Sequence, residues 1–519
     1  MRKKILWVDD EIEFLRSHVM FLETRGYSVT TASNGDEAVR LVGEDDLGYD
    51  IVLLDKQMPV KSGNATLDEI KACRPDLPIV MLTGYQHNAD IAAGKRYDAC
   101  LTKPVDPNKL LATCQRVLDA KLSASRKLAD KYLRSYTENQ TRASGQLSAS
   151  DWMSLYHTLA KWDVEIDGVG GEGMRQTHTG LKSDCGKTFC GFVAENYTEW
   201  IRGRHNRPPM QVDVVRKVIA PELREGRGVL MAVLNGMRLD QFLGIERELR
   251  RNFSVSGMKL MSLLPSTADF CVAALASGFY PDEAAEAEPT VFGQGEADPI
   301  VMKRLMRRGL ERAGADKAKA FYASADGVNG RRHVRSAINA MKKGPAFGVV
   351  TVDIIRKLCG GCAADTKPSD PPAIDEAAFR RQVDSWFANS TTLSMMKEAC
   401  GDSCTVVLTS GHGHVFCRRP SEIYETRQTD LSRRSLFSDR VSVDEREVFL
   451  LQELSHFRLP PNEFGAMCLM AREDFYFALH TKGDNIHKPC ASSFQNGGIS
   501  PEEMILPLYV CRPLAGVAR

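Results

Sequence analysis

Two short apolar runs near the N-terminus each end in acidic residues. Lys4–Val8 is followed by Asp9 and Asp10, and Ile51–Leu54 is followed by Asp55. Continuous apolar runs of this length predict buried parallel strands. Because an open α/β sheet places its site at the C-terminal ends of the strands, we expect these three carboxylates to converge at one edge of a doubly wound sheet.

Two further runs bring a hydroxyl and an amine to the same edge. Ile79–Leu82 precedes Thr83, and a strand near Cys100 precedes Lys103. Thr83 can donate a hydrogen bond to a phosphoryl oxygen, and Lys103 can place a positive charge beside it. Clustered carboxylates suit Mg²⁺, which prefers oxygen ligands and bridges phosphate oxygens. A single acid after a strand would be interpreted as a helix cap, but here all the parts recur in order.

The segments WVDDE, LLDKQMP, MLTGY and LTKPV closely resemble the motifs of response-regulator receiver domains, over residues 1–119. The resemblance implies phosphorylation of Asp55 by a sensor histidine kinase. It also implies that Asp9, Asp10 and Asp55 bind Mg²⁺. Thr83 and Lys103 would sense the phosphoryl group. Most receivers carry Tyr or Phe three positions before the lysine, where this chain has Cys100. We therefore expect the signal to leave the domain by a different coupling.

The chain of 519 residues is too long for one hydrophobic core. Residues 120–225 lack strand signals and show apolar residues at helical spacing, which predicts a helical-bundle connector. Residues 226–519 contain strand-like runs at 228–234, 346–352 and 404–408, which predict a second α/β domain. No apolar run is long enough to cross a bilayer and no signal peptide is evident, so we expect a cytoplasmic location without membrane insertion. The net charge of +1 and the lack of a recognition helix argue against DNA binding.

Polar residues also follow the strands of the second α/β domain. Asn235 follows the first run, Asp353 the second, and His412 and His414 the third. Of these residues, His412, His414 and Asp353 predict either a metal site or, equally, a tight turn built from glycine and histidine.

Five segments of this half, in order, are similar to the PglZ domain of the alkaline phosphatase superfamily. They are VLNGMRLDQF, LLPSTADFCVAALASGFYP, VVTVDIIRKL, VVLTSGHGHV and QNGGISPEEMILP. The layout of receiver, helical bundle and PglZ domain resembles PorX-type response regulators over nearly the whole chain. Working members of the superfamily hydrolyse phosphate mono- or diesters with two zinc ions and a threonine nucleophile.

The resemblance allows each site position to be compared. At the six ligand positions the chain has Asn235, Asp353, Lys357, Gly411, His412 and Asn496. Only Asp353 and His412 keep the family's residue. Ala268 stands at the nucleophile position, and Ser266 or Thr267 could replace it only with a shift of register.

Two remaining ligands are fewer than the three or four that zinc requires. The leading hypothesis is a regulator switched by phosphorylation of Asp55, which forms a homodimer when phosphorylated. Its PglZ-like domain would be a pseudoenzyme that binds a protein or a nucleotide-like ligand. The alternative is a receiver-controlled zinc phosphodiesterase or phosphatase with atypical ligands.

Overall fold

The computed structural model describes residues 2–44, 48–74, 76–84, 97–203, 206–292, 298–325, 330–354, 358, 375–401, 403–424, 428–438, 443–461, 467–480 and 492–514. The chain forms two compact units. Unit 1 comprises residues 1–137 and 164–178, and unit 2 comprises residues 138–163 and 179–519. The predicted domain limits at 119 and 225 stay predictions.

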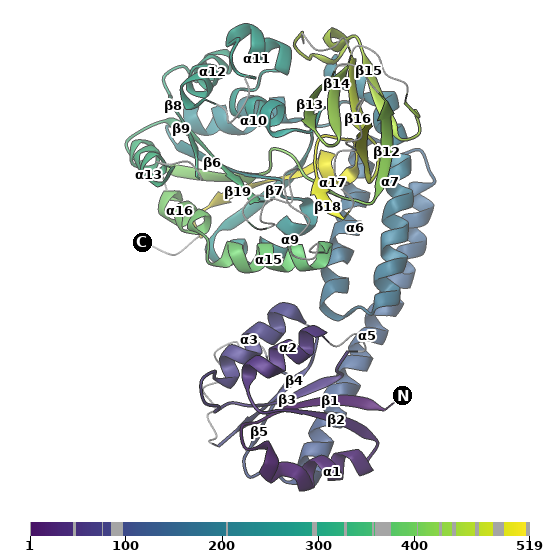
Figure 1. The fold of residues 1–519 in the computed structure, drawn as a ribbon. Helices are drawn as coiled ribbons and strands as arrows, with labels where there is room; N and C mark the ends of the chain where they lie inside the picture. The colour runs from purple at the N-terminus through teal and green to yellow at the C-terminus, as the bar shows by residue number, and fades with distance from the viewer. Residues whose placement is uncertain are drawn as a thin grey trace. The chain divides into compact units, whose positions relative to one another are not determined.

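Unit 1 is built on a five-stranded sheet in the order β2-β1-β3-β4-β5, with all neighbours parallel (Figure 1). The strands are β1 (Lys3–Val8), β2 (Tyr27–Ala32), β3 (Ile51–Asp55), β4 (Ile79–Thr83) and β5 (Ala99–Thr102). The helices are η1 (Ile12–Leu15), α1 (Arg16–Thr24), α2 (Gly35–Glu44), α3 (Gly63–Cys73) and α5 (Pro107–Ala143). Four of these strands were predicted from the apolar runs, and the predicted doubly wound order is confirmed.

Side-chain alternation along the strands divides the core of unit 1 between two faces. Ile5 and Trp7 pack on one face with residues of α1 and α5. Leu6 and Val8 pack on the other face with residues of α2 and α3. Helices therefore cover both faces of the parallel sheet, which explains why its strands are apolar throughout.

Unit 2 contains a six-stranded mixed sheet in the order β7-β19-β10-β6-β9-β8. Its strands are β6 (Gly228–Asn235), β7 (Ser254–Met261), β8 (Lys319–Ser324), β9 (Ala346–Asp353), β10 (Cys404–Thr409) and β19 (Ile505–Arg512). The last four strands of this order run parallel, and β19 is antiparallel to both of its neighbours. The runs predicted at 228–234, 346–352 and 404–408 are thus the three adjacent central strands.

Helices cover both faces of this sheet (Figure 1). One face packs against α9 (Leu239–Asn252), α13 (Gly330–Met341), α15 (Glu376–Ala388) and α16 (Thr391–Ala399). The other face packs against η3 (Val215–Ile219), α8 (Ala220–Arg224), α10 (Ala268–Ser277), α11 (Pro281–Ala287) and α12 (Pro299–Arg312). The predicted multidomain α/β class is therefore confirmed.

The predicted connector is helical where the structure describes it. Its long helices are α5, α6 (Ala149–Val169) and α7 (Glu172–Ile201), followed by η2 (Gln211–Asp213). Smaller sheets complete unit 2, with β11 (Val415–Cys417), β12 (Arg419–Tyr424), β13 (Gln428–Ser432), β14 (Ser435–Ser438), β15 (Val448–Gln452), β16 (Met467–Ala471), β17 (Phe475–His480) and β18 (Ser493–Gln495). Two short helices, η4 (Leu454–Phe457) and α17 (Pro501–Met504), belong to the same region.

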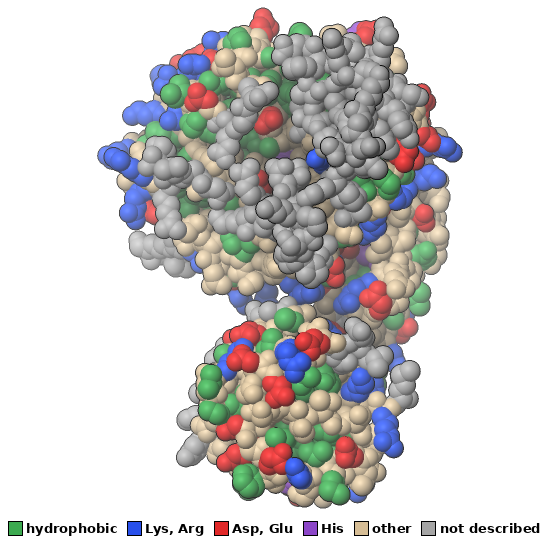
Figure 2. Space-filling model, in the orientation of Figure 1, with side chains coloured by type: hydrophobic (Ala, Val, Ile, Leu, Met, Phe, Trp, Pro, Cys, Tyr) green, Lys and Arg blue, Asp and Glu red, His purple; other side chains and the backbone are tan. Residues whose placement is uncertain are grey.

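The described surface is mixed in charge. Acidic and basic side chains are interspersed over the visible face of each unit (Figure 2), in keeping with the net charge of +1. Among the described residues, no helix is both long and apolar enough to cross a membrane.

Candidate functional site

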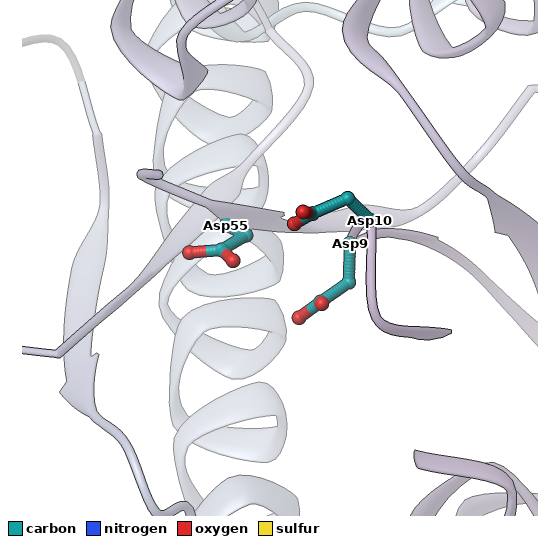
Figure 3. A group of neighbouring side chains, drawn as sticks. All are labelled: Asp9, Asp10 and Asp55. Atoms are coloured by element: carbon teal, nitrogen blue, oxygen red, sulfur yellow. The ribbon is translucent and has the colours of Figure 1, made fainter. Parts of the chain in front are cut away.

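Three carboxylates meet at the C-terminal ends of β1 and β3. Asp9 and Asp10 follow β1, and Asp55 is the last residue of β3. The parallel pairing of Val8 with Leu54 aligns the two strand ends. One ligand atom from each acid lies within 4.8 Å of the others, and Figure 3 shows the three side chains gathered at these strand ends. Asp9 and Asp55 are buried, whereas Asp10 is exposed.

Lys103 completes this cluster with a positive charge. Its Nζ lies 2.7 Å from Oδ2 of Asp55 and 2.9 Å from Oδ2 of Asp9. Burial by itself would lower the pKa of Lys103, but the hydrogen bonds to Asp55 and Asp9 outweigh it and raise the pKa above its ordinary value. The lysine is therefore held as a cation between two carboxylates.

Thr83 ends β4 at the same edge of the sheet. The pairing of Asp55 with Leu82 puts the threonine beside the end of β3. The backbone nitrogen of Lys103 donates a hydrogen bond of 2.8 Å to the carbonyl of Thr83, and the Thr83 side chain is buried. The structure thus brings together the five residues predicted for the receiver site.

Backbone groups behind the cluster were not identified from the sequence. The backbone N–H of Gln57 donates to Oδ1 of Asp55 at 3.1 Å, and that of Glu11 donates to Oδ1 of Asp9 at 3.0 Å. Gly63 approaches the strand so closely that a Cβ there would lie 2.0 Å from the carbonyl oxygen of Asp55. A glycine directly after Ser62, which caps α3, was the available signal for this contact.

Cys100 lies on β5, where most receivers have the switch aromatic. The cysteine is exposed to solvent. A cysteine there cannot supply the ring that turns between two positions, so the expectation of a different coupling stays a prediction.

A second group of polar residues lies at the C-terminal ends of β6, β9 and β10. Asn235 and Asp353 are direct partners in the parallel pairing of β6 with β9. Gly411 is packed against Asn235 and Val272, because a Cβ on it would lie 2.4 Å from Oδ1 of Asn235 and 2.9 Å from Cγ2 of Val272. His412 accepts a hydrogen bond of 3.1 Å at its carbonyl from the backbone N–H of Gly236. These four candidate residues therefore share one edge of the sheet.

The two histidines of this edge differ in their surroundings. Burial lowers the pKa of His412, and the nearby Asp353 carboxylate opposes this shift. His414 packs between the rings of Phe379 and Phe494, at centroid distances of 5.2 and 4.9 Å. Burial lowers the pKa of His414 to about 3, and its Nδ1 is hydrogen-bonded to the carbonyl of Gly236. His414 is thus a neutral core residue of a tight turn.

Within the described part of the chain, His412, His414 and Asp353 do not form a three-ligand metal cluster. The only such cluster there is Asp9, Asp10 and Asp55. Of the two interpretations of the histidine segment, the structure favours the tight turn. Lys357 lies outside the described residues.

The residues around Ala268, which stands at the family's nucleophile position, lie at the start of α10. Ala268 is the first residue of α10, and Thr267 precedes it as the N-cap. The Ser266 hydroxyl donates to the carbonyl of Gly498 at 2.8 Å, and the Asn496 amide donates to the carbonyl of Ser266 at 3.4 Å. The Thr267 hydroxyl is buried and has no hydrogen-bond partner among the described residues, as is also true of Oδ1 of Asn235.

A buried ion pair, which the sequence did not predict, supports this region. Nε and one terminal nitrogen of Arg434 donate to the two carboxylate oxygens of Glu503 at 2.9 and 2.8 Å. Glu503 also accepts a hydrogen bond of 2.9 Å from the backbone N–H of Gly498. Since both side chains are fully buried, this pair fixes the segment that carries Asn496 and Gly498.

Comparisons with known proteins agree with the geometry of unit 1. A family model described as the response regulator receiver domain matches residues 5–115, and one described as the PorX response regulator linker domain matches residues 123–201. The two-component response regulator ARR22 of Arabidopsis thaliana is 31% identical over 121 residues, which are 22% of this chain and 84% of that protein.

Two further comparisons cover a similar share of the chain. The transcriptional regulatory protein CpxR homolog of Haemophilus influenzae is 35% identical over 135 residues, 26% of this chain and 58% of that protein. A receiver-domain crystal structure from Clostridium thermocellum is 34% identical and covers 23% of this chain and 96% of that one, with a TM-score of 0.22. The chain spans less than two thirds of the length of the Haemophilus relative.

The parallel sheet and its acidic cluster, with a lysine between two carboxylates, define a receiver of the two-component class. Together with the linker match, they show that the chain belongs to the PorX-type response regulators. The assignment of residues 226–519 as a PglZ domain remains a proposal.

Proposed function

We propose that Asp55 accepts a phosphoryl group from a sensor histidine kinase. The observation that carries this proposal is the convergence of Asp9, Asp10 and Asp55 beside the Lys103 ammonium. The three carboxylates fit Mg²⁺, because they offer an oxygen-only ligand set at a partly open strand end. When bound, the ion would neutralise the charge that the phosphoryl oxygens bring to the site.

Three groups of the chain are proposed to orient the Asp55 carboxylate and to contact the phosphoryl oxygens. Oδ1 of Asp55 accepts from the backbone N–H of Gln57, which fixes the orientation of the carboxylate. The Lys103 ammonium donates a hydrogen bond to Oδ2 of the same carboxylate. It is positioned to pair with the phosphoryl oxygens after transfer. The Thr83 hydroxyl, at the neighbouring strand end, is the proposed donor to a phosphoryl oxygen.

Phosphorylation of the full chain by acetyl phosphate with Mg²⁺ tests this role. We expect an intact-mass increase of one phosphoryl group in the wild type and in the control Asp36→Asn, whose acid is exposed on α2. Asp55→Asn should remove the increase. Labelling that survives Asp55→Asn would assign the phosphoryl group to another residue.

We further propose that phosphorylation promotes homodimer formation. Leu122 and Leu133 of α5 are apolar side chains that are 45% and 60% exposed in unit 1, which suits a contact that forms only in the switched state. Light scattering of the chain with Mg²⁺ and beryllofluoride, which mimics the phosphoryl group, should give twice the monomer mass. Leu133→Gln should weaken this dimer, and an unchanged mass on activation would exclude it.

For residues 226–519 we propose a PglZ-like domain that acts by binding and has lost zinc-dependent hydrolysis. Only Asp353 and His412 retain the family's ligands, and Gly411 has no room for a side chain beside Asn235. Oδ1 of Asn235 and the Thr267 hydroxyl are buried without a hydrogen-bond partner among the described residues, so a ligand could pair with them only by reaching into these strand ends. Zinc does not fit this set of residues, since two ligands leave the ion without its usual three or four.

A second candidate is a zinc phosphodiesterase or phosphatase with atypical ligands. It is favoured by one observation, the position of Asp353 and His412, the two residues that keep the family's ligands, at the same edge of the sheet. Metal analysis and hydrolysis of bis(4-nitrophenyl) phosphate separate the two candidates. Zinc at one ion per chain, with turnover that is lost in Asp353→Ala and His412→Ala, would establish the enzyme and overturn the binding domain.

A further inference from the structure

Helix α13 concentrates positive charge in a chain whose net charge is only +1. Residues 330–346 contain five Lys or Arg and no Asp or Glu. The apolar side chains of the helix face the core of unit 2, and these are Val334, Ala337, Ile338 and Met341. The opposite side of the helix is therefore both exposed and basic.

One stripe along α13 carries four exposed polar residues. They are spaced at i, i+3, i+7 and i+10, which puts them on one side of a helix, and they are Arg332, Arg335, Asn339 and Lys342. The backbone N–H of Lys342 donates to the carbonyl of Ile338 at 3.1 Å, so the helical spacing extends to this lysine. At the rise of an α-helix the stripe is about 15 Å long. We call these four residues the basic stripe.

Acidic side chains do not neutralise the basic stripe. In the part of the chain that the structure describes, none of its three charged residues has an ion-pair partner. Lys343 follows the stripe directly, and the backbone N–H of Lys319, at the start of β8, donates to the carbonyl of Pro345 at 3.3 Å. Two more lysines therefore lie near the end of α13. Helix α16, which packs against α13, adds one Lys and one Glu, so it leaves the balance unchanged.

The lysine end of the stripe is remote from the candidate site of unit 2. Asn235 and Asp353 lie at the C-terminal ends of β6 and β9, whereas Lys342 precedes the N-terminal end of β9. Figure 2 shows Lys and Arg side chains on the side of unit 2 where Figure 1 draws α13. A function of the basic stripe therefore does not rest on the PglZ-like assignment.

The side chains of α13 favour one kind of partner. Its described residues include no exposed apolar side chain, whereas protein interfaces depend on buried apolar and aromatic anchors. The helix has no Phe, Tyr or Trp on which unpaired bases could stack. Stable membrane binding by a basic surface also needs an apolar or lipid anchor. Arg, Lys and Asn are common donors to the phosphate oxygens of a duplex, so a double helix fits the stripe best.

We propose that the basic stripe binds the phosphate backbone of a nucleic-acid duplex without reading its sequence. A DNA duplex carries about one negative charge per 1.7 Å of its axis, so several phosphates lie along the roughly 15 Å of the stripe. Arg332, Arg335 and Lys342 pair with these phosphates, and the Asn339 amide adds an uncharged donor between them. The net charge of the whole chain conceals this surface, because basic and acidic residues balance elsewhere.

The test measures fluorescence anisotropy of the full chain with a labelled DNA duplex about two helical turns long and with an RNA duplex of the same sequence. The stripe variant replaces the three charged residues of the stripe and is Arg332→Gln/Arg335→Gln/Lys342→Gln. The control removes three exposed charges from α9, which packs against β7 and β19 at the other end of the sheet, and is Arg247→Gln/Arg250→Gln/Arg251→Gln. Both variants lose the same net charge, and circular dichroism checks that both are folded.

At low ionic strength we expect the stripe variant to bind at least about tenfold more weakly, and the control to bind as the wild type does. The slope of log affinity against log salt should become smaller by about two to three, roughly one for each lost phosphate contact. A duplex of unrelated sequence should bind equally well, since no base edge is read. Binding of only one of the two duplexes supports the proposal and identifies the nucleic acid as DNA or RNA.

Three results would overturn the proposal. The first is equal losses of duplex binding in the stripe variant and the control, and the second is no binding of either duplex at low salt. The third is a preference of more than about tenfold for one duplex sequence, which would require contacts with base edges. If polyglutamate or phosphatidylglycerol vesicles bind through the stripe and neither duplex does, the surface serves an acidic protein or a membrane instead.

Discussion

Nζ of Lys103 lies 2.7 Å from Oδ2 of Asp55, the residue proposed to accept the phosphoryl group. The same nitrogen is 2.9 Å from Oδ2 of Asp9. One lysine therefore neutralises part of the acidic cluster before any metal or phosphoryl group arrives. Its charge opposes the approach of a cation and favours that of an anion, so the two proposed ligands should respond to it in opposite ways.

Lys103→Met should tighten Mg²⁺ binding several-fold. Removing one positive charge about 4 Å from the carboxylates changes the interaction with a cation by roughly 1 kcal/mol or more, depending on solvent screening. Calorimetric titration of the unphosphorylated chain measures the change. Lys109→Met, on the exposed side of α5, should leave the affinity unchanged. An affinity in Lys103→Met equal to that of the wild type would contradict the proposed metal site.

Gly63→Ala should destabilise the receiver by about 2 kcal/mol or more. The new Cβ would lie 2.0 Å from the carbonyl oxygen of Asp55 and 2.8 Å from Cα of Lys56, and backbone atoms cannot move aside cheaply. Gly43→Ala in α2 meets no atom within 4 Å and should stabilise by roughly 0.5–1 kcal/mol. Hydrogen exchange of β3 in each variant reports both effects. Similar protection in the two variants would refute the close contact.

Glu503→Gln should cost unit 2 about 3–5 kcal/mol, because it leaves the buried Arg434 guanidinium without its carboxylate. Replacing both residues by methionine should recover much of this loss, since no charge then remains buried. Urea unfolding of the three proteins gives the comparison. A double variant no more stable than Glu503→Gln would mean that the pair contributes more than charge compensation.

Gly411→Ala should cost roughly 1–3 kcal/mol, because its Cβ would meet Oδ1 of Asn235 and Cγ2 of Val272. Adding Asn235→Ala should return part of this stability, as expected for two residues in contact. Gly401→Ala, where nothing lies within 4 Å, is the control for the new methyl group. Additive effects at 411 and 235, measured by urea unfolding, would show that the two side chains do not compete for space.

His157→Gln should reduce the loss of stability in acid. The folded pKa of about 4 lies below the ordinary value of 6.5, so between these pH values the unfolded chain binds a proton that the folded chain excludes. Stability contributed by the neutral ring is present above pH 6.5 and is lost as the pH falls towards 4. The variant should lower the slope by at most about 1.4 kcal/mol per pH unit, less where water screens the half-buried ring. Identical slopes in urea unfolding would place His157 in ordinary solvent.

The sequence predicted the central strands of both sheets, because each is a continuous apolar run followed by a polar residue. It did not predict β2, whose segment YSVTTA is half polar, nor β19, which contains Pro507. Proline lacks the N–H that a strand uses, and so lowers the expectation of one. The edge strands β7 and β8 were missed for a related reason, since an edge strand is partly exposed and mixes polar with apolar residues.

The sequence alone determined that Asp9, Asp55, Thr83 and Lys103 would meet. Each residue follows an apolar run that predicts a strand, and sites of parallel sheets lie at the C-terminal ends of the strands, so only local sequence was needed. The tertiary structure alone decided which of these side chains pair, with Lys103 between Asp55 and Asp9. It also decided the contact of Gly411 with Asn235 and the burial of Arg434 with Glu503, 69 positions away. Such contacts depend on how distant segments pack, and no local pattern of residue types records them.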